Sequence, residues 1–366
     1  MGLETKPILL VGSIPGDDAA GVFSACGPAL GSHVAAMPDG ETGNRRIWVT
    51  FLAATVLDKH PHIHAINRPK PVGSIENEWR TADEDWVPSS FDDLWFFSVE
   101  EGVEEVEINS LGYAEHASAS YADFQRLKAA GQIAADVRFQ VCLPLAESAL
   151  RWFIADKRSY DIVAPAYEKA LRSEIEQITK AIPATELTIQ WDVCMEVVAA
   201  ALDDFTNQPP LAYKLAGTPI ERWITALAEF SPLIPADTHV GLHLCYGDLG
   251  HKHMVEPEDL SLSVEMANLG CAKAGRRIDY VHMAVPRDRK DSAYFAPLDK
   301  LEIGDTMPYL GLVHHTDGEP GTRERISAAK EFLQTFGIAT ECGFGRRPAE
   351  QIPELMAIHC QVLDAL

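Results

Sequence analysis

A histidine and a cysteine lie two residues apart at the end of one apolar segment of the chain. This segment, GLHLC at 241–245, has the composition of a β-strand and is followed at once by the turn-forming residues YGD at 246–248. Because a strand alternates its side chains, His243 and Cys245 point to one face and the leucines to the other. The sequence therefore predicts an imidazole and a thiol together at the C-terminal end of a strand.

Two later strand-like segments end in donors of the same kind. His282 lies in segment 278–285, and Cys342 lies in segment 338–343. Imidazole nitrogen and thiolate sulfur are common zinc ligands, so donors that converge from three strand ends predict a zinc site. The candidate ligands are His243, Cys245, His282 and Cys342.

The overall composition narrows the class of protein. A chain of 366 residues, 46% of them hydrophobic, can bury a large core and fits either one large α/β barrel or two ordinary domains. With 31 basic and 54 acidic residues, the net charge of −23 argues against a nucleic-acid partner, because that binding depends on basic side chains that displace counterions.

Targeting and redox signals point to the cytoplasm. The N-terminus lacks a basic region followed by an apolar run, and no segment approaches the roughly 18 apolar residues that a membrane span needs. We therefore expect a soluble cytoplasmic protein without a membrane partner. The seven cysteines are odd in number and widely scattered, which fits reduced thiols or metal ligands better than a disulfide framework.

The order of strand-like and helix-like segments predicts how these residues are positioned. Strand-like segments begin near residues 8, 33, 137, 187, 239, 278, 309 and 338. Helical periodicity marks segments 121–131, 166–182, 220–230, 260–274 and one that carries Ile326, Ala329, Leu333 and Phe336. This count and alternation predict a single (β/α)8 TIM barrel over residues 1–366, in which catalytic groups gather at the C-terminal ends of the strands.

Two segments interrupt the regular pattern. The polar loop at 38–48 is either a surface turn or a loop over a pocket mouth, where Glu41 or Arg45 contacts the substrate. Segment 59–112 is rich in prolines, acids and aromatics, and we interpret it as a cap-like insertion after the second strand that covers or walls a site. Its aromatic residues would alternatively form a small core of their own. These are Trp79, Trp86, Trp95, Phe96 and Phe97.

Five motifs together resemble one enzyme family. They are GSIPG at Gly12, IQWDVCMEV at Ile189, GLHLCYGDLG at Gly241, LGLVHHTDGEPGTRERISAA at Leu310 and ECGFGRR at Glu341. They are similar to the catalytic C-terminal barrel of cobalamin-independent methionine synthase, within the superfamily that also holds uroporphyrinogen decarboxylase and the corrinoid-linked methyltransferases. The resemblance runs from the first strand to the last, and segment 59–112 has no counterpart in it.

The resemblance implies a zinc site with one departure. In the family, zinc is held by the His and Cys of the H-x-C strand, a glutamate on the following strand and the late cysteine. His243, Cys245 and Cys342 match this pattern, and His282 stands where the glutamate is expected. Two alternatives follow: a site with two histidines and two cysteines, or a three-ligand site with His282 nearby as a base.

The substrate signature also departs from the family. Gln190 and Asp192 are kept, but Val193, Cys194 and Met195 replace the Glu-Pro-Ala portion that helps the synthase to hold the ammonium group of its amino-acid substrate. The resemblance therefore does not extend to homocysteine itself. Gln190, Asp192 and Glu196 remain candidates for binding a polar substrate, although Glu196 would alternatively only cap the following helix.

The resemblance implies methyl transfer to a thiol acceptor that is activated on zinc. The donor would be a folate, a corrinoid protein or a small methylated compound. The alternative is a zinc-dependent lyase or hydrolase that acts on a small polar or aromatic substrate, with His282, His314 or Asp317 moving protons. The candidate catalytic residues are Asp192, His314 and His315; since His314 and His315 are successive, at most one of them faces the site. A metal-binding barrel without catalysis, and packed thiols without any metal, also remain open.

Overall fold

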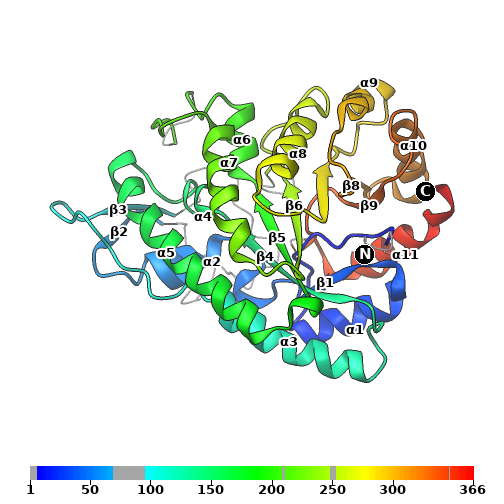
Figure 1. Ribbon diagram of the computed structural model, residues 1–366, viewed down its shortest axis with the longest axis horizontal. Helices are drawn as coiled ribbons and strands as arrows, with labels where there is room; N and C mark the ends of the chain where they lie inside the picture. The colour runs from blue at the N-terminus through cyan, green and yellow to red at the C-terminus, as the bar shows by residue number, and fades with distance from the viewer. Residues whose placement is uncertain (1–5, 69–94, 208–210, 248–252, 346) are drawn as a thin grey trace.

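Seven of the predicted strands form one parallel sheet. The computed structural model describes residues 6–68, 95–207, 211–247, 253–345 and 347–366. The order of strands in the sheet is β1-β4-β5-β6-β7-β8-β9. Their bounds are Ala36–Pro38 (β1), Arg138–Pro144 (β4), Leu187–Val193 (β5), His239–Leu244 (β6), Tyr280–Ala284 (β7), Met307–Val313 (β8) and Gly337–Thr340 (β9). Figure 1 shows this sheet curled at the centre of a mixed α/β fold, with helices around it.

The predicted closed barrel of eight strands is corrected to this curled sheet of seven. The segment predicted as the first strand forms only isolated bridges, in which Ile8 pairs with Val34 beside β1 and with Ile338 in β9. Leu9 N donates to Ile338 O at 2.9 Å, so the segment touches both edges of the sheet without joining either ladder. Pro7 and Pro15 flank it, and since proline has no backbone N–H, a regular ladder cannot extend far in either direction.

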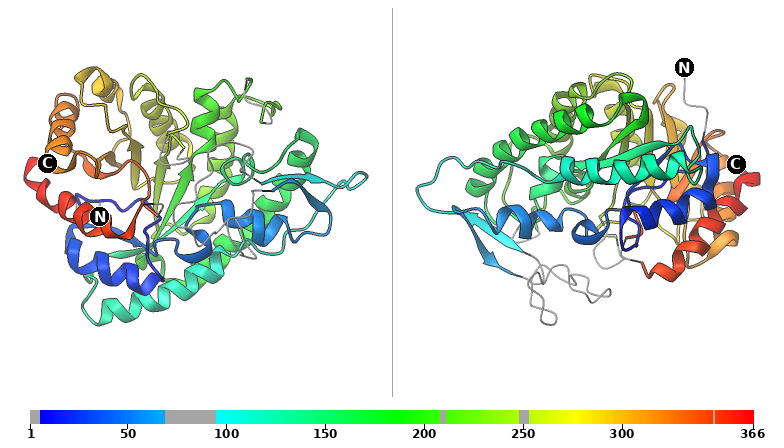
Figure 2. Two further views of the ribbon diagram at one scale, coloured as in Figure 1. Left: turned by 180° about the vertical axis from the view of Figure 1, so that it is seen from behind. Right: turned by 90° about the horizontal axis from the view of Figure 1, so that it is seen from below.

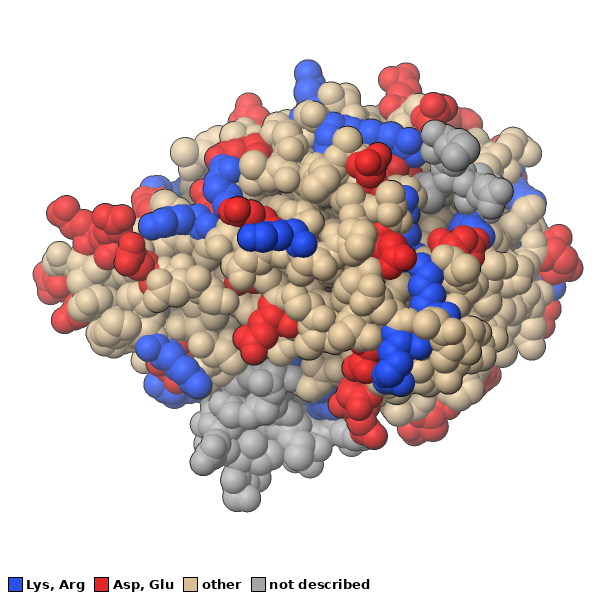
Figure 3. All heavy atoms as spheres, turned by 60° about the horizontal axis from the view of Figure 1, so that its bottom comes forward, with Lys and Arg blue, Asp and Glu red and all other residues tan. Residues whose placement is uncertain are grey.

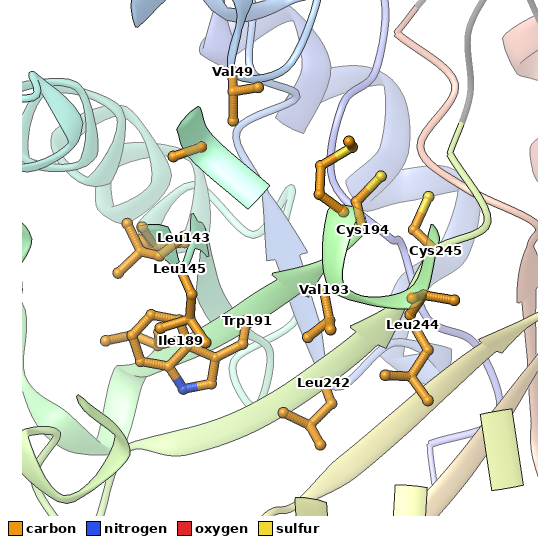
Figure 4. Packing of buried hydrophobic residues seen from close by; sticks show 14 of the residues in the cluster. Val49, Leu143, Leu145, Ile189, Trp191, Val193, Cys194, Leu242, Leu244 and Cys245 are labelled. Carbon is orange, nitrogen blue, oxygen red and sulfur yellow. The ribbon is translucent and has the colours of Figure 1, made fainter. Parts of the chain in front are cut away.

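Alternation along the strands separates two faces of the sheet. On β5, Trp191 points outward, where its ring lies 6.5 Å from that of Phe230 and its Nε1 donates to Ser231 Oγ at 3.0 Å. Gln190 points inward and donates from Nε2 to Val11 O at 2.6 Å. Figure 4 shows the apolar side chains of β5 and β6 gathered on one side of these strands. The inner face is left for polar and sulfur-containing groups.

Two glycines make room on the inner face for tyrosine rings. A Cβ added at Gly241 would lie 2.0 to 2.3 Å from the ring of Tyr280, and one at Gly337 would lie 2.3 Å from the ring of Tyr309. The two rings meet edge to face, with centroids 5.8 Å apart. The tyrosines therefore fill the lower interior beneath the site, because their neighbouring strands carry no side chain at these positions.

We expect Gly241→Ala to destabilise the protein by about 1 to 3 kcal/mol, because the added methyl overlaps a packed ring that has no space to move into. Urea unfolding should measure the change. Gly21→Ala is a matched control in a helix, where the nearest atom to the new Cβ is 3.4 Å away. Equal stability of the two variants would contradict this explanation of Gly241.

The helices cover the outer face and the ends of the sheet. Their bounds are Ala19–Leu30 (α1), Thr50–Leu52 (α2), Tyr113–Ala129 (α3), Ala146–Leu150 (α4), Lys157–Ala181 (α5), Met195–Ala201 (α6), Pro219–Phe230 (α7), Ser261–Lys273 (α8), Ser292–Phe295 (α9), Gly318–Lys330 (α10) and Ile352–Gln361 (α11). The helix predicted at 166–182 begins nine residues earlier, since Asp156 caps it by accepting from Ser159 N and Pro165 is tolerated inside.

The insertion contains a separate two-stranded antiparallel sheet. Its strands are β2 (Ile63–Asn67) and β3 (Phe96–Val99). Trp95 and Phe97 stack with ring centroids 5.5 Å apart, and Phe97 bridges to Ile154, so these aromatics join the main core rather than a private one. Figure 2 shows the hairpin at the end of the molecule opposite the termini. Trp79 and Trp86 lie outside the described residues.

In the part of the chain that the structure describes, none of the helices combines the length and the apolar character needed to cross a membrane.

Candidate metal centre and neighbouring carboxylates

Three of the predicted zinc ligands meet at the C-terminal end of the sheet. His243 comes from β6, Cys245 follows β6 directly, and Cys342 follows β9. One donor atom from each lies within 4.8 Å of the other two. The Cys245 and Cys342 sulfurs are 3.7 Å apart, and Cys342 Sγ is 3.7 Å from His243 Nε2.

The donor set fits zinc in chemistry and in spacing. With zinc–sulfur bonds of about 2.3 Å, two thiolates of a tetrahedral site lie about 3.8 Å apart. The observed separation of the Cys245 and Cys342 sulfurs, 3.7 Å, is close to this value. Two thiols and one imidazole leave one tetrahedral position for another ligand, which is the arrangement of a catalytic rather than a closed structural zinc site.

His282 stands behind His243 rather than beside the sulfurs. His243 and His282 are register partners on β6 and β7, and their Nδ1 atoms are 2.7 Å apart. His282 Nε2 lies 3.0 Å from Thr340 O. Because a carbonyl only accepts, Nε2 of His282 carries the proton and its Nδ1 must accept from His243. His243 then keeps a lone pair on Nε2, the atom that faces Cys342.

Burial keeps both imidazoles neutral. Burial and the neighbouring His282 lower the pKa of His243 well below its usual value, and burial lowers the pKa of His282 to about 4. Neutral rings are required for the hydrogen-bond chain from Thr340 O to His243, and a neutral imidazole is the form that binds metal.

A third sulfur lies next to the centre. A hydrogen bond with the Cys194 thiol and burial both raise the pKa of Cys245. Figure 4 shows the two thiols at the ends of β5 and β6, on the side away from the apolar packing. In the protein alone the Cys245 thiol therefore favours the protonated form, and a cation beside it would favour thiolate.

A second cluster lies one strand away. Glu41, Cys142 and Asp192 are all buried, and one donor atom from each lies within 4.8 Å of the others. Asp192 is the register partner of His243. This pairing places the cluster beside the sulfur centre, formed by His243, Cys245 and Cys342, on the same face of the sheet. The Arg45 guanidinium interacts electrostatically with Glu41, so this cluster holds two buried carboxyl groups with a cation nearby.

Asp192 is held by two donors and is nevertheless hard to ionise. Gln190 Nε2 donates to its Oδ1 at 2.8 Å, and Trp48 Nε1 donates to its Oδ2 at 3.0 Å. Burial raises the pKa of Asp192 to about 7, although both hydrogen bonds act in the opposite direction. Asp192 can therefore exchange a proton near neutral pH.

The side chains of Gln190 and Arg45 bind other residues of the protein. Gln190 Oε1 accepts from Tyr280 OH at 2.9 Å while its amide donates to Val11 O and Asp192, so Gln190 orients Asp192. Arg45 Nη2 lies 2.5 Å from Asp39 Oδ2 in a mostly buried ion pair. Glu41 adopts a φ of 51°, a strained conformation that turns the loop at 38–48 toward Asp192.

Glu196 belongs to a different network. It lies in the first turn of α6, where its carboxylate accepts from Ser148 N at 3.2 Å and from Ser148 Oγ. Ser148 Oγ in turn accepts from the backbone N–H groups of Cys194 and Met195 at 3.0 and 3.1 Å. Burial and the nearby Glu147 raise the pKa of Glu196 to about 8. These contacts tie α4 to α6 and are not among the contacts of either donor cluster.

The successive histidines after β8 point to different places. His314 is buried, with Nε2 3.0 Å from Val285 O and Nδ1 paired with Glu341 Oε2. His315 is a quarter exposed and pairs with Glu354 on α11 at 2.9 Å. Burial opposes ionisation of Glu341, but His314, Arg347 and His253 lower its pKa to about 2. Of the two histidines, only His314 approaches the loop that carries Cys342.

The sequence alone did not single out several supporting residues. Trp48, Cys142 and Glu341 contact or adjoin the two clusters, and Thr340 fixes the tautomer of His282. Glu341 is the one with a local signal, since it directly precedes Cys342 in the ECG motif. The others come from loops or strands distant in sequence and carry no distinguishing pattern.

Comparison with known proteins returns similar structures but no family. No protein-family model matches the chain, and no curated protein matches its sequence. A B12-independent methionine synthase from Shewanella sp. W3-18-1 in complex with selenomethionine aligns with a TM-score of 0.47 and 13% identity over 76% of this chain and 74% of its own. A putative vitamin-B12-independent methionine synthase from Listeria monocytogenes aligns with a TM-score of 0.42 and 15% identity, over 74% and 72%.

Proposed function

We propose that this protein is a zinc-dependent methyltransferase that moves a methyl group to a thiol acceptor other than homocysteine. The observation that carries the proposal is the convergence of one imidazole and two thiol donors within 4.8 Å at the C-terminal end of the sheet, with one ligand position left over. His243, Cys245 and Cys342 are the proposed ligands. The motif resemblance described above supports the same reaction class.

The chain prepares these ligands and a polar site beside them. Zinc, when bound, lowers the pKa of a thiol ligand so that the nucleophilic thiolate exists at neutral pH. His282 and Thr340 O hold His243 in the tautomer that presents Nε2. The His314–Glu341 pair fixes the start of the loop that carries Cys342. His282 and His314 thus act as positioning residues in this proposal.

Glu41 and Asp192 are the proposed substrate-binding groups. They are buried near each other beside the centre, and Trp48 and Gln190 orient Asp192. A cationic group, such as an ammonium, would favour the ionised form of Asp192, whose pKa burial raises to about 7. The acceptor is accordingly a thiol compound that also carries a positive charge. Arg45 supports this pocket through Asp39 rather than by binding the substrate.

The second candidate is a zinc-dependent lyase or hydrolase. One observation favours it: burial raises the pKa of Asp192 to about 7, which suits a general acid or base near neutral pH. Methyl transfer remains the first candidate because two thiol ligands make an electron-rich centre that favours bound thiolate. No finding supports a corrinoid protein as partner, so the proposed donor is a folate or a small methylated compound.

The deciding experiment is a turnover assay that is repeated once without the methyl donor and once without the thiol. The zinc-loaded chain is incubated with a methyl-labelled folate or a small methylated compound and with an amino thiol, and products are identified by mass spectrometry. A labelled thioether that requires both donor and thiol supports the proposal. Breakdown of one compound without any methyl acceptor would contradict it and support the lyase. Cys342→Ser should abolish either activity.

The role of His282 gives a separate prediction. His282→Leu keeps similar volume but removes the acceptor for His243, so the zinc affinity of the centre formed by His243, Cys245 and Cys342 should fall by about 10- to 100-fold while this centre still fills at saturation. Competition with a coloured chelator measures the affinity. His239→Leu, at the opposite end of β6, is the control. If this centre takes up no zinc in His282→Leu even at saturation, His282 is itself a ligand.

A further inference from the structure

Two histidines lie on one exposed face of the β2–β3 hairpin, at a distance in sequence from the proposed zinc ligands. His64 lies in β2 and His62 directly precedes the strand; the two flank Ile63, whose side chain is buried, and both are exposed to solvent. Their side chains are 50% and 58% exposed. The arrangement leaves both rings accessible to a solute.

The carboxylate of Glu100, the residue that directly follows β3, faces both rings. Glu100 N donates to His62 O at 3.0 Å, which places Glu100 directly across the hairpin. Its Oε2 is 2.9 Å from His62 Nδ1 and 4.0 Å from His64 Nε2. One carboxylate oxygen thus faces two imidazole nitrogens, and backbone pairing of the two strands holds the three groups together.

Glu100 can pair electrostatically with both histidines. Its contact with His62 also has the length of a hydrogen bond, whereas 4.0 Å is too long for a hydrogen bond from His64. Two imidazoles and one carboxylate on one face, with the remaining positions open to water, are the donor set that divalent transition metals use in facial sites.

We propose that His62, His64 and Glu100 form a second metal site, which binds a divalent transition-metal ion such as zinc or nickel. His60 is outside the set, because its Nδ1 accepts from His62 N at 3.1 Å. The site is independent of the centre formed by His243, Cys245 and Cys342, because it uses no thiol and lies at a different sheet. Its side chains must move closer together to surround an ion, which their exposure allows.

The surroundings favour a cation. Exposed glutamates follow β3 at positions 100, 101, 104, 105 and 107. Figure 3 shows acidic side chains gathered at the tip of the molecule that this segment occupies. Negative potential of this kind raises the local concentration of cations. His62 also lines a surface groove of about 650 Å³, through which an ion can reach the site.

The test is a zinc titration of the full metal-free chain by equilibrium dialysis. The wild type should bind about two zinc ions per chain, and His62→Ala/His64→Ala about one. Cys342→Ala should lose the other ion, so failure of this site is distinguishable from failure of the proposed function. His33→Ala is the matched control, since His33 is also exposed.

A spectroscopic readout identifies the ligands. With the centre formed by His243, Cys245 and Cys342 already filled by zinc and Cu²⁺ added as the probe, electron paramagnetic resonance should show two nitrogen ligands in the otherwise unchanged chain and one in His64→Ala, and Glu100→Gln should weaken binding at least tenfold. The exposure of all three residues means that these variants should fold. Equal zinc stoichiometry and affinity in His62→Ala/His64→Ala and His33→Ala would overturn the proposal.

Discussion

Cys342→Ala is expected to remove about one zinc ion per chain and to abolish turnover. In the described part of the chain, the thiol of Cys342 is the only donor that lies 3.7 Å from both Cys245 Sγ and His243 Nε2. Its loss therefore removes the ligand that adjoins both of the others. The fall in zinc affinity should exceed the roughly 100-fold limit typical of a residue that only orients a ligand. Cys245→Ala should behave in the same way.

Elemental analysis of protein purified without chelator measures this effect. Cys271→Ala is the matched control, since Cys271 is partly buried on α8 and its thiol donates to Thr306 Oγ1. The comparison is made in the His62→Ala/His64→Ala background, so that the hairpin does not contribute zinc. Full zinc content in Cys342→Ala would reject Cys342 as a ligand and rule out the proposed centre, whether or not turnover is lost.

Asp192→Asn is expected to make the protein more stable at pH 8 while it abolishes binding of a cationic substrate. Burial raises the pKa of Asp192 from 3.8 to about 7 in the folded protein. The unfolded chain therefore ionises first as the pH rises, and the free energy of unfolding falls between about pH 4 and pH 7. At about 1.4 kcal/mol per pH unit, this raised pKa costs the folded state roughly 4 kcal/mol above pH 7.

Asparagine carries no charge, so the variant should lack this fall in stability. Its amide NH2 group must face one of the two donors, Trp48 or Gln190. This mismatch reduces the gain in the free energy of unfolding by about 1 kcal/mol. Urea unfolding of both proteins at pH 5 and pH 8 measures the difference. Asp237→Asn, at an exposed position, should leave the pH dependence unchanged. Parallel pH profiles for wild type and Asp192→Asn would contradict the assigned burial effect.

The alternation of residues along single strands was readable from the sequence. It predicted the positions of seven strands, and it predicted that His243 and Cys245 share a face, because both features depend only on the local geometry of an extended chain. The prediction that segment 8–13 is a strand of a closed barrel was wrong. Its pairing depends on two edges of the sheet that are distant in sequence, and on prolines that limit the length of the ladder.

Tertiary structure alone decided which distant groups meet. Cys342 joins Cys245 from 97 residues away, and the curl of the sheet determines their separation. Strand register sets His282 against His243, so that its nitrogens are occupied by Thr340 O and by the neighbouring ring. Composition and spacing identify possible donors, but whether a histidine binds, orients a neighbour or pairs at the surface depends on contacts between strands, which local sequence does not encode.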